Sequence, residues 1–244
     1  MGEDVEQDNA VGVQRLFSQR LMCRFFVAIG GYPPEEALED FAAVSRRDRT
    51  MGWSHGSGWG MLWLRRGEAG VYRSVRAIWE SFVPPPRGYD IYVLHSRLAS
   101  VGSIAIENTH PILRGGFAIV HNGTLDKEGL TAELKRRGLD VKTAGGTDTE
   151  LLLSAFVELG GNEKAAREVA EVAKRYIDRE EPLLNFAIVD LNEAQVYLYT
   201  YRLVEHPHFV PQISKGSPIL ISSEPVGRDS WMPIPNDTLL TLRT

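Results

Sequence analysis

The chain has 244 residues, of which 43% are hydrophobic and 24% charged, so it can bury a substantial core in one large domain or two small ones. Its formal net charge of -5 argues against non-specific nucleic-acid binding, and no apolar run reaches the ~18 residues that a membrane helix needs. The single cysteine, Cys23, cannot form an internal disulfide, which indicates a reducing compartment, most simply the cytoplasm.

The first 22 residues differ from the rest of the chain. They begin with acidic residues and carry Arg15 and Arg20 only later, which is the reverse of the charge order in a secretory signal. One interpretation is a solvated tail. The other is a pro-segment that is removed, or a natural translation start at Met22. We find no domain boundary further along and expect one domain over 23–244.

Hydrophobic periodicity and breaker residues predict an ordered series of strands and helices. The first part of the chain is predicted to contain a strand over 23–29, a helix over 35–49, a strand entered through the alternating glycines of HGSGWG, and a helix over 75–82. Strands over 91–96 and 116–121 follow, and then helices over 127–137, 147–159 and 162–176. The last part contains a hairpin of 185–190 with 195–200 and strands over 219–222 and 238–242. Strands come in runs separated by groups of helices. This order favours an α+β fold in which helices cover antiparallel sheets.

Four polar segments stand at the ends of these elements. They are HSRLAS at 95–100, NTHP at 108–111, HNG at 121–123 and GGTDTE at 145–150. Each has a purely structural explanation. Asn122-Gly123 after an apolar strand is typical of a hairpin turn, and Thr147 with Glu150 has the spacing of a capping box. Taken singly, none of them indicates chemistry.

Two other kinds of site find little support in the sequence. Four histidines, His55, His95, His110 and His121, lie near predicted strand ends, but no pair has the spacing of a zinc motif. We therefore predict no metal and no cofactor. A serine hydrolase of the GxSxG type is also not indicated, because that motif is absent.

The four segments follow the lone cysteine, Cys23, in the order given above. In this arrangement they resemble the class II glutamine amidotransferases, a family of N-terminal-nucleophile hydrolases. MCRFF is similar to the opening of that family, HSRLAS to its arginine motif, NTHP to its histidine-proline motif, HNG to its oxyanion motif and TDTE to its aspartate motif. ISSEPVGRDSWMPIP near the end of the chain resembles the tail of the small stand-alone members. The resemblance covers nearly all of 23–242. It implies a four-layer αββα sandwich, with two antiparallel sheets between helical layers.

The resemblance implies that Cys23 is the nucleophile and begins the mature chain. A thiol has a pKa of about 8.5 and an α-amino group one of about 7.7 to 8.0, so a free amine on the cysteine itself can act as its base near neutral pH. That amine does not exist while Cys23 is joined to Met22. The resemblance further implies that the Asn122 side-chain amide and the Gly123 backbone N–H form the oxyanion hole.

The remaining family positions imply a substrate with a free amino-acid end. Arg97 would bind the α-carboxylate, with Ser100 adding a hydroxyl contact, and Asp148 would hold the α-ammonium. We expect Thr147 to cap the following helix while Asp148 faces the pocket, and His110 to orient rather than to act as the base. The implied substrate is glutamine or another γ-glutamyl compound, cleaved through a cysteinyl thioester.

Several interpretations stay open at this stage. Released ammonia would pass to a separate synthase subunit, or to no partner if the protein is a plain hydrolase. A non-catalytic binding descendant of the same fold is the alternative if Cys23 stays blocked. An acylase of the same fold is disfavoured by Arg97 and Asp148, which an apolar acyl chain would not need.

Overall fold

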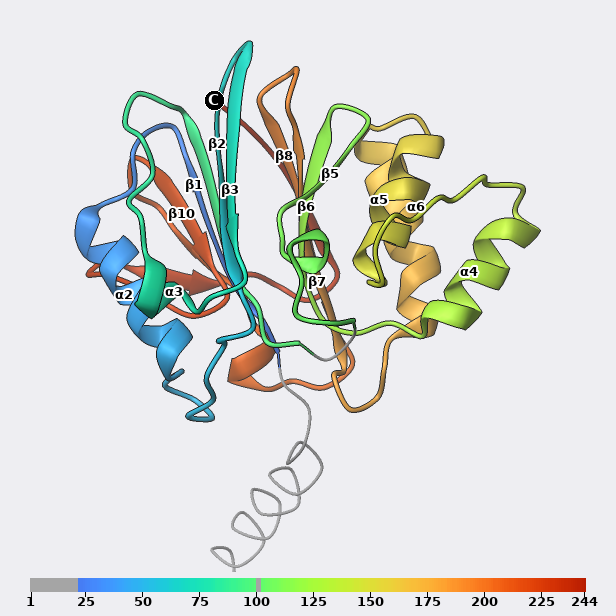
Figure 1. Cartoon of the computed structure of the whole chain (residues 1–244), viewed down its shortest axis with the longest axis horizontal. Coiled ribbons are helices and arrows are strands. Elements are labelled where there is room, and N and C mark those ends of the chain that lie inside the picture. Colours follow the sequence, from blue (N-terminus) through green and yellow to red (C-terminus); the bar gives the residue numbers. More distant parts are fainter. Residues whose placement is uncertain (1–21, 100–101) are drawn as a thin grey trace, which may run out of the picture.

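The computed structural model describes residues 22–99 and 102–244, in which two antiparallel sheets lie face to face between layers of helices (Figure 1). The strand order is β11-β9-β10-β1-β4-β2-β3 in one sheet and β12-β8-β7-β6-β5 in the other. The first sheet contains β1 (Arg24–Ile29), β2 (Trp59–Arg65), β3 (Glu68–Ser74), β4 (Ile91–Ser96), β9 (Gln212–Ser214), β10 (Ile219–Ser222) and β11 (Trp231–Pro233). The second contains β5 (Ile112–Arg114), β6 (Phe117–Asn122), β7 (Leu183–Asp190), β8 (Gln195–Arg202) and β12 (Thr238–Arg243).

Helices cover the outer face of each sheet (Figure 1). On the seven-stranded sheet these are α2 (Glu35–Arg46) and the single turn α3 (Ile78–Ser81). On the five-stranded sheet they are α4 (Lys127–Arg136), α5 (Thr149–Glu158) and α6 (Glu163–Ala173). Short 3-10 turns occur at Ile106–Asn108, Lys174–Tyr176 and Pro207–Phe209. The expected α+β fold with αββα layers is confirmed.

Strand β1 lies in the interior of this sandwich, between β10 and β4. Successive side chains of a strand point to opposite faces. Phe25 and Val27 pack in the apolar layer between the sheets, while Phe26 packs against α2 on the other face. Because both faces are covered, all six residues of β1 are buried, including the charged Arg24. Cys23, the residue just before β1, is therefore attached to a strand that is paired on both edges and covered on both faces.

Two predicted helices are shorter than expected. The helix predicted over 35–49 ends at Arg46, because the carboxylate of Asp48 accepts hydrogen bonds from the backbone N–H groups of residues 50 to 53 and folds that segment into a loop. The helix predicted over 75–82 is only α3, since the backbone at Ala77 is still extended, with φ -64° and ψ 147°. The other helices and the β7–β8 hairpin are confirmed, with ends shifted by a few residues.

Four strands were not predicted from the sequence. They are β3, β5, β9 and β11. Three of them have only three residues each, too few to carry a periodic pattern, and β3 has no buried residue. Pairing with longer neighbours makes these segments strands.

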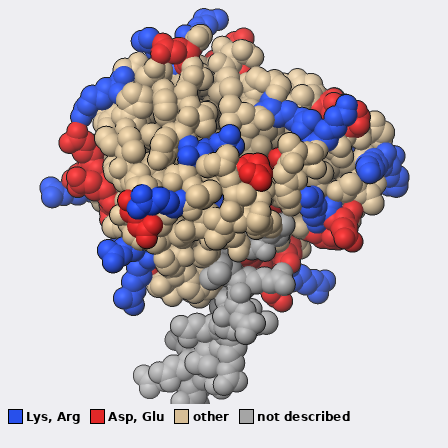
Figure 2. Space-filling view, in the orientation of Figure 1, with Lys and Arg blue, Asp and Glu red and all other residues tan. Residues whose placement is uncertain are grey.

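The surface gives two further observations. Lys and Arg side chains are interspersed with Asp and Glu around the face seen in Figure 2, without a large area of one sign. Within residues 22–99 and 102–244, no helix combines the length and hydropathy of a membrane span.

Candidate active site

The polar segments singled out in the sequence meet where the two sheets adjoin. Cys23 directly precedes β1, Arg97 directly follows β4, Gly123 directly follows β6 and Asp148 directly precedes α5. They line one small cavity of about 20 Å³, together with the neighbouring residues Leu98, His110, His121, Thr147 and Thr149. Five of the seven predicted site residues thus share this cavity. Asn122 contacts Cys23 directly, and Ser100 lies outside the described residues.

The Cys23 thiol sits against the backbone of Leu98. Its sulfur accepts from the Leu98 N–H over 3.4 Å and lies 3.6 Å from the Leu98 carbonyl oxygen. Burial raises the pKa of the Cys23 thiol to about 12, and the nearby charge of Glu181 acts in the same direction. In this form of the chain, with Met22 attached, the sulfur is therefore a neutral thiol at physiological pH.

The two expected oxyanion-hole residues stand at the end of β6. The Asn122 side-chain amide donates to the backbone carbonyl oxygen of Cys23 over 2.8 Å. Gly123 has φ +126°, and a Cβ at this position would lie 2.4 Å from the Leu183 carbonyl oxygen, so only glycine fits. The alternative of a hairpin turn at Asn122-Gly123 is wrong, because the chain runs on from β6 into α4.

Arg97 reaches across the loop that follows it. Its guanidinium donates to the backbone carbonyls of Ser103 over 2.8 Å and of Gly102 over 3.2 Å. Arg97 is buried, with 3% of its surface exposed. Burial lowers the pKa of its guanidinium from the ordinary value, while the nearby Cys23 and Asp148 groups raise it. The planar fork is therefore held in position at the cavity wall.

The start of α5 differs from the expectation. Asp148, not Thr147, is the N-cap, and its carboxylate accepts from the backbone N–H of Thr149 over 3.0 Å and of Leu125 over 2.7 Å. Glu150 accepts from the Gly145 N–H instead of closing a capping box. The buried Thr147 hydroxyl has no hydrogen-bond partner among the described residues. A short acidic side chain caps as well as threonine does, so the spacing alone did not separate the two.

Three buried histidines stand beside the cavity. His95 Nε2 lies 3.1 Å from His110 Nδ1 and 3.2 Å from the His121 carbonyl oxygen, and the His121 N–H points at His110 Nδ1 over 3.4 Å. Burial lowers the pKa of all three, that of His95 to about 3, so the rings are neutral near pH 7. These contacts assign the proton to His95 Nε2 and make His110 Nδ1 an acceptor. The Nδ1 atom of His110 is thus engaged by its neighbours at the cavity wall.

The glycines of HGSGWG allow this close packing. A Cβ on Gly60 would lie 2.3 Å from the His110 carbonyl oxygen, and one on Gly58, with φ +106°, would lie 2.9 Å from the Ser74 oxygen. The backbone of this segment pairs with Arg97, through the Ser57 N–H and the Gly58 carbonyl at 2.8 Å each. The segment therefore fixes the strand end from which Arg97 projects.

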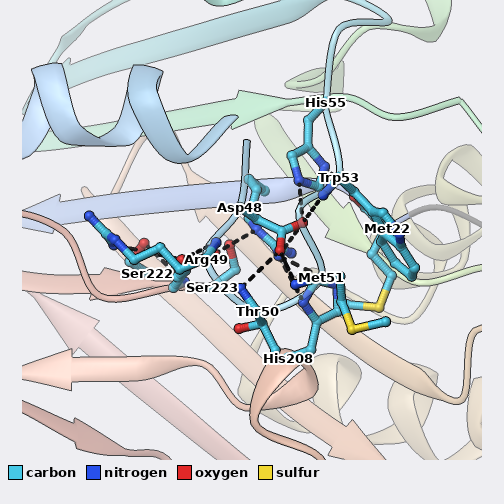
Figure 3. A network of polar contacts seen from close by, with 12 residues as sticks. Met22, Asp48, Arg49, Thr50, Met51, Trp53, His55, His208, Ser222 and Ser223 are labelled. Carbon is cyan, nitrogen blue, oxygen red and sulfur yellow. Dashed lines mark hydrogen bonds and ion pairs between the residues drawn. The ribbon is translucent and has the colours of Figure 1, made fainter. Parts of the chain in front are cut away.

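Sequence reasoning missed a buried charge cluster beside Met22 and Cys23 (Figure 3). Arg24 lies 3.3 Å from the Asp48 carboxylate and 3.5 Å from that of Glu224. His55 joins Asp48 over 3.2 Å, and its Nδ1 lies 2.5 Å from the Met22 carbonyl oxygen. Glu224 belongs to the SEP segment, which the sequence singled out without a structural role. One feature of the sequence could have indicated this cluster: Arg24 lies in a predicted strand whose other residues are apolar.

The SEP segment also supports the backbone next to the nucleophile. The Phe25 N–H donates to the Ser223 hydroxyl over 3.1 Å, and the Ser223 N–H donates back to the Phe25 carbonyl over 3.0 Å. Residues from the two ends of the domain therefore hold β1 together. Among the residues that the structure describes, no group of three or more His, Cys, Asp and Glu side chains is arranged to hold a metal ion.

The layers, the strand orders and the cysteine in front of β1 define the class of protein, the N-terminal-nucleophile hydrolase sandwich. The sequence model of the family described as glutamine amidotransferases class-II matches residues 22–180, which is more than half of the chain. The chain belongs to the class II glutamine amidotransferases, as its motifs indicate.

Individual relatives agree with this assignment. The glutamine–fructose-6-phosphate aminotransferase (isomerizing) of Encephalitozoon cuniculi is 25% identical over 149 residues, which are 58% of this chain and 19% of that protein. The chain thus spans about a fifth of the length of this relative. A glutamine aminotransferase class-II domain protein from Silicibacter pomeroyi has a similar structure, with a TM-score of 0.59 at 16% identity over 91% of this chain and 95% of its own.

A second solved structure shares the fold with a longer chain. The glutamine phosphoribosylpyrophosphate amidotransferase from B. subtilis has a TM-score of 0.57 at 16% identity, over 91% of this chain and 49% of that chain. At this level of identity the likeness concerns the fold alone. It confirms the predicted sandwich.

Proposed function

We propose that this protein hydrolyses the γ-glutamyl amide of glutamine, or of a γ-glutamyl compound, through a thioester on Cys23. The observation that carries the proposal is the single cavity shared by Cys23, Gly123, Arg97 and Asp148. It combines a sulfur nucleophile, an oxyanion donor, a fixed cation and a carboxylate within reach of one small ligand.

The proposed reaction begins with a free α-amino group on Cys23. This amine takes the thiol proton, and the thiolate attacks the γ-carbonyl carbon. The oxyanion that forms accepts hydrogen bonds from the Asn122 amide and the Gly123 N–H. The C–N bond then breaks, the leaving nitrogen takes the proton from the α-ammonium group, and ammonia or an amine departs. Water hydrolyses the thioester with the amine as base, which releases glutamate and restores the thiol.

The proposed substrate contacts follow from charge and placement. Arg97 supplies a planar cation for the α-carboxylate, and Asp148 supplies a carboxylate for the α-ammonium. Ser100 would add a hydroxyl contact to the carboxylate. The present cavity of about 20 Å³ has room for about one water, so substrate entry requires the site to open or Met22 to leave.

The fate of ammonia is a separate part of the proposal. The matched relatives are named as an aminotransferase and an amidotransferase, and this chain spans only part of each of those two. We propose that ammonia passes to an acceptor synthase on a separate subunit, or that the protein works alone as a hydrolase of small γ-glutamyl compounds. The cytoplasm is the proposed compartment.

One observation favours a second candidate function, a non-catalytic binding protein of the same fold. Met22 is 2% exposed and packs against Trp53, Leu183 and Phe209, so a retained residue 22 fits the structure well and blocks the amine. The two functions differ in a single measurable property, which is turnover by a chain that begins at Cys23.

The test joins intact mass with a glutaminase assay on one sample. We expect the active species to begin at Cys23 and to release glutamate from glutamine, and we expect Cys23→Ala to release none. Cys23→Ser separates sulfur chemistry from ligand binding, since it keeps the shape of the site. An active chain that retains residue 22, or full turnover by Cys23→Ser, would refute the proposal.

A further inference from the structure

The buried pair Asp48 and His55 adjoins the carbonyl group of Met22 (Figure 3). His55 Nε2 lies 3.2 Å from the Asp48 carboxylate, and His55 Nδ1 lies 2.5 Å from the Met22 carbonyl oxygen. That oxygen and the Cys23 nitrogen are bonded to the same carbonyl carbon. Both side chains are fully buried, with 0% exposure in the pair. No step of the proposed reaction has yet used them.

The backbone of His55 is held by its surroundings. The backbone N–H of His55 donates to the Ser45 carbonyl oxygen over 2.8 Å, and the Ser96 hydroxyl donates to the backbone carbonyl oxygen of His55 over 2.8 Å. Ser96 ends β4, the strand that leads into the active-site Arg97. His55 is therefore tied to the same framework as the cavity.

Asp48 is an ionised acceptor. Burial raises its pKa, but the hydrogen bond from His55, the charge of Arg24 and the backbone N–H groups lower it by more, so the pKa lies well below its ordinary value. An ionised carboxylate can only accept, so His55 Nε2 carries a proton. A neutral His55 ring then has a lone pair on Nδ1.

This proton assignment conflicts with the peptide bond that is present. The Nδ1 lone pair would face a carbonyl oxygen, and only a doubly protonated ring could donate to both oxygens. Burial, the largest influence, lowers the pKa of His55 and opposes that charge. If residue 22 is absent, the carbonyl oxygen is gone and the Cys23 nitrogen becomes an amine with hydrogens to donate. A neutral His55 ring can accept at Nδ1 a hydrogen that the amine carries, whereas the Met22 carbonyl oxygen has no hydrogen to donate.

We propose that His55, backed by Asp48, accepts a hydrogen bond from the α-amino group of mature Cys23 and holds that amine in position to take the thiol proton. This inference rests on the proposed function, because it needs a chain that begins at Cys23. His55 acts through the amine, so it is a positioning residue. The site it defines is one that the uncleaved chain blocks with the Met22 carbonyl.

Two substitutions distinguish this role from a purely structural one, in which His55 serves only as a hydrogen-bond partner of Asp48. His55→Asn keeps an acceptor near the Nδ1 position and loses the contact with Asp48. His55→Gln keeps a donor near the Nε2 position and loses the acceptor for the amine. Misplacement of the base by about 1 Å costs on the order of 100-fold in rate. We expect kcat to fall about 100-fold in His55→Gln with KM within about twofold, and to fall much less in His55→Asn.

The pH profile gives a second readout. An acceptor for the ammonium form raises the amine pKa, so its loss in His55→Gln should move the acid limb of the kcat profile to lower pH. The charged and titratable groups around the pair are unchanged in both variants. Arg24, His208 and Glu224 lie on the side of Asp48, His95 lies on the side of His55, and Glu181, Arg97 and Asp148 surround Cys23. Asn162→Ala serves as the control and should keep the wild-type profile, because Asn162 caps α6 through the Ala165 N–H and is not part of this cluster.

A measurement on the unaltered ring avoids the risk that a variant does not fold. The full chain is labelled with ¹⁵N-histidine, the form that begins at Cys23 is identified by intact mass, and His55 is assigned by its absence in the variants. We expect a neutral ring protonated at Nε2 in this form. A neutral ring protonated at Nδ1, or a lower kcat in His55→Asn than in His55→Gln, would overturn the inference and leave the proposed function intact. A preparation without any active chain that begins at Cys23 would overturn both.

Discussion

Asn122 donates a hydrogen bond from its side-chain amide to the backbone carbonyl oxygen of Cys23 over 2.8 Å, across the gap between the two sheets. The proposed oxyanion donor is thus already oriented toward the nucleophile residue by a contact within the protein. A donor that is fixed before the reaction needs no reorganisation when charge develops.

Replacing this donor should slow the chemical step. In Asn122→Ala we expect kcat for glutamate release to fall about 100-fold to 1000-fold, while KM changes little, because in the proposed reaction the amide contacts the oxyanion rather than the amino-acid end of the substrate. Steady-state kinetics of processed enzyme checks this. A loss confined to KM would instead place Asn122 in substrate binding.

The uncleaved chain should contain an unreactive thiol. Since burial raises the pKa of Cys23 to about 12, the thiolate is scarce at pH 7.5 in a chain that still carries Met22. We expect iodoacetamide to modify this form far more slowly than the form that begins at Cys23. Mass spectrometry of a timed reaction measures both rates, and equal rates would contradict the expectation.

Asp148 combines a cap with the proposed ammonium contact. In Asp148→Asn the amide oxygen can still accept from the Thr149 N–H at the start of α5, while the second acceptor, which serves the Leu125 N–H, is lost. Asparagine is among the best N-cap residues, so we expect a modest loss of stability of about 1 kcal/mol. The negative charge is lost, however. We expect kcat/KM for glutamine to fall at least about 10-fold with the change mainly in KM. Thermal unfolding and kinetics on one sample separate the two effects.

A matched control for this variant is Asn162→Ala. Asn162 caps α6 by accepting from the Ala165 N–H over 3.1 Å, far from the cavity in sequence and on a different helix. We expect a similar loss of about 1 kcal/mol with unchanged kinetics. A fall in activity here would mean that stability alone explains the Asp148 result.

The histidine group should make the protein sensitive to acid. The pKa of His95 is about 3 in the folded protein and ordinarily about 6.5, so the unfolded chain binds a proton first as the pH falls. The free energy of unfolding should therefore be highest above pH 6.5 and decrease progressively as the pH falls from about 6.5 toward 3. The lowered pKa values of His110 and His121 add to this dependence.

Melting temperatures between pH 7.5 and 4.5 measure the effect. We expect His95→Gln to be destabilised at pH 7.5 but to lose less stability with falling pH, because it lacks one such group. Asn162→Ala should have a lower melting temperature than the wild type at pH 7.5, but its melting temperature should decrease with falling pH as steeply as that of the wild type. The same slope in His95→Gln would show that His95 is not the group involved.

The long, apolar elements and the motif residues could be predicted from the sequence, because each rests on local pattern. Short strands such as β9 and β11 could not, since three residues carry no period and long-range pairing decides their conformation. The choice between Thr147 and Asp148 as N-cap was likewise decided by tertiary contacts, here the Leu125 N–H.

The charge cluster beside Met22 and Cys23 could not be predicted from the sequence for a related reason. It joins Arg24, the nearby pair Asp48 and His55, and Glu224, which come from three separate parts of the sequence. Only the pairing of β1 with β10 brings Glu224 beside Arg24. Arg24, His55 and Glu224 lie in segments that the sequence singled out, but nothing in those segments indicated that their side chains meet.

The pairing of Phe26 with Ser222 has a consequence for the order of events during synthesis. The surroundings of β1 are incomplete until Ser222 has emerged from the ribosome and paired, whereas Met22 becomes inaccessible once they close. An exopeptidase that exposes the Cys23 amine would therefore have to act before this pairing is complete. Maturation and folding would then compete in time, and slow trimming would leave a permanently capped, silent population.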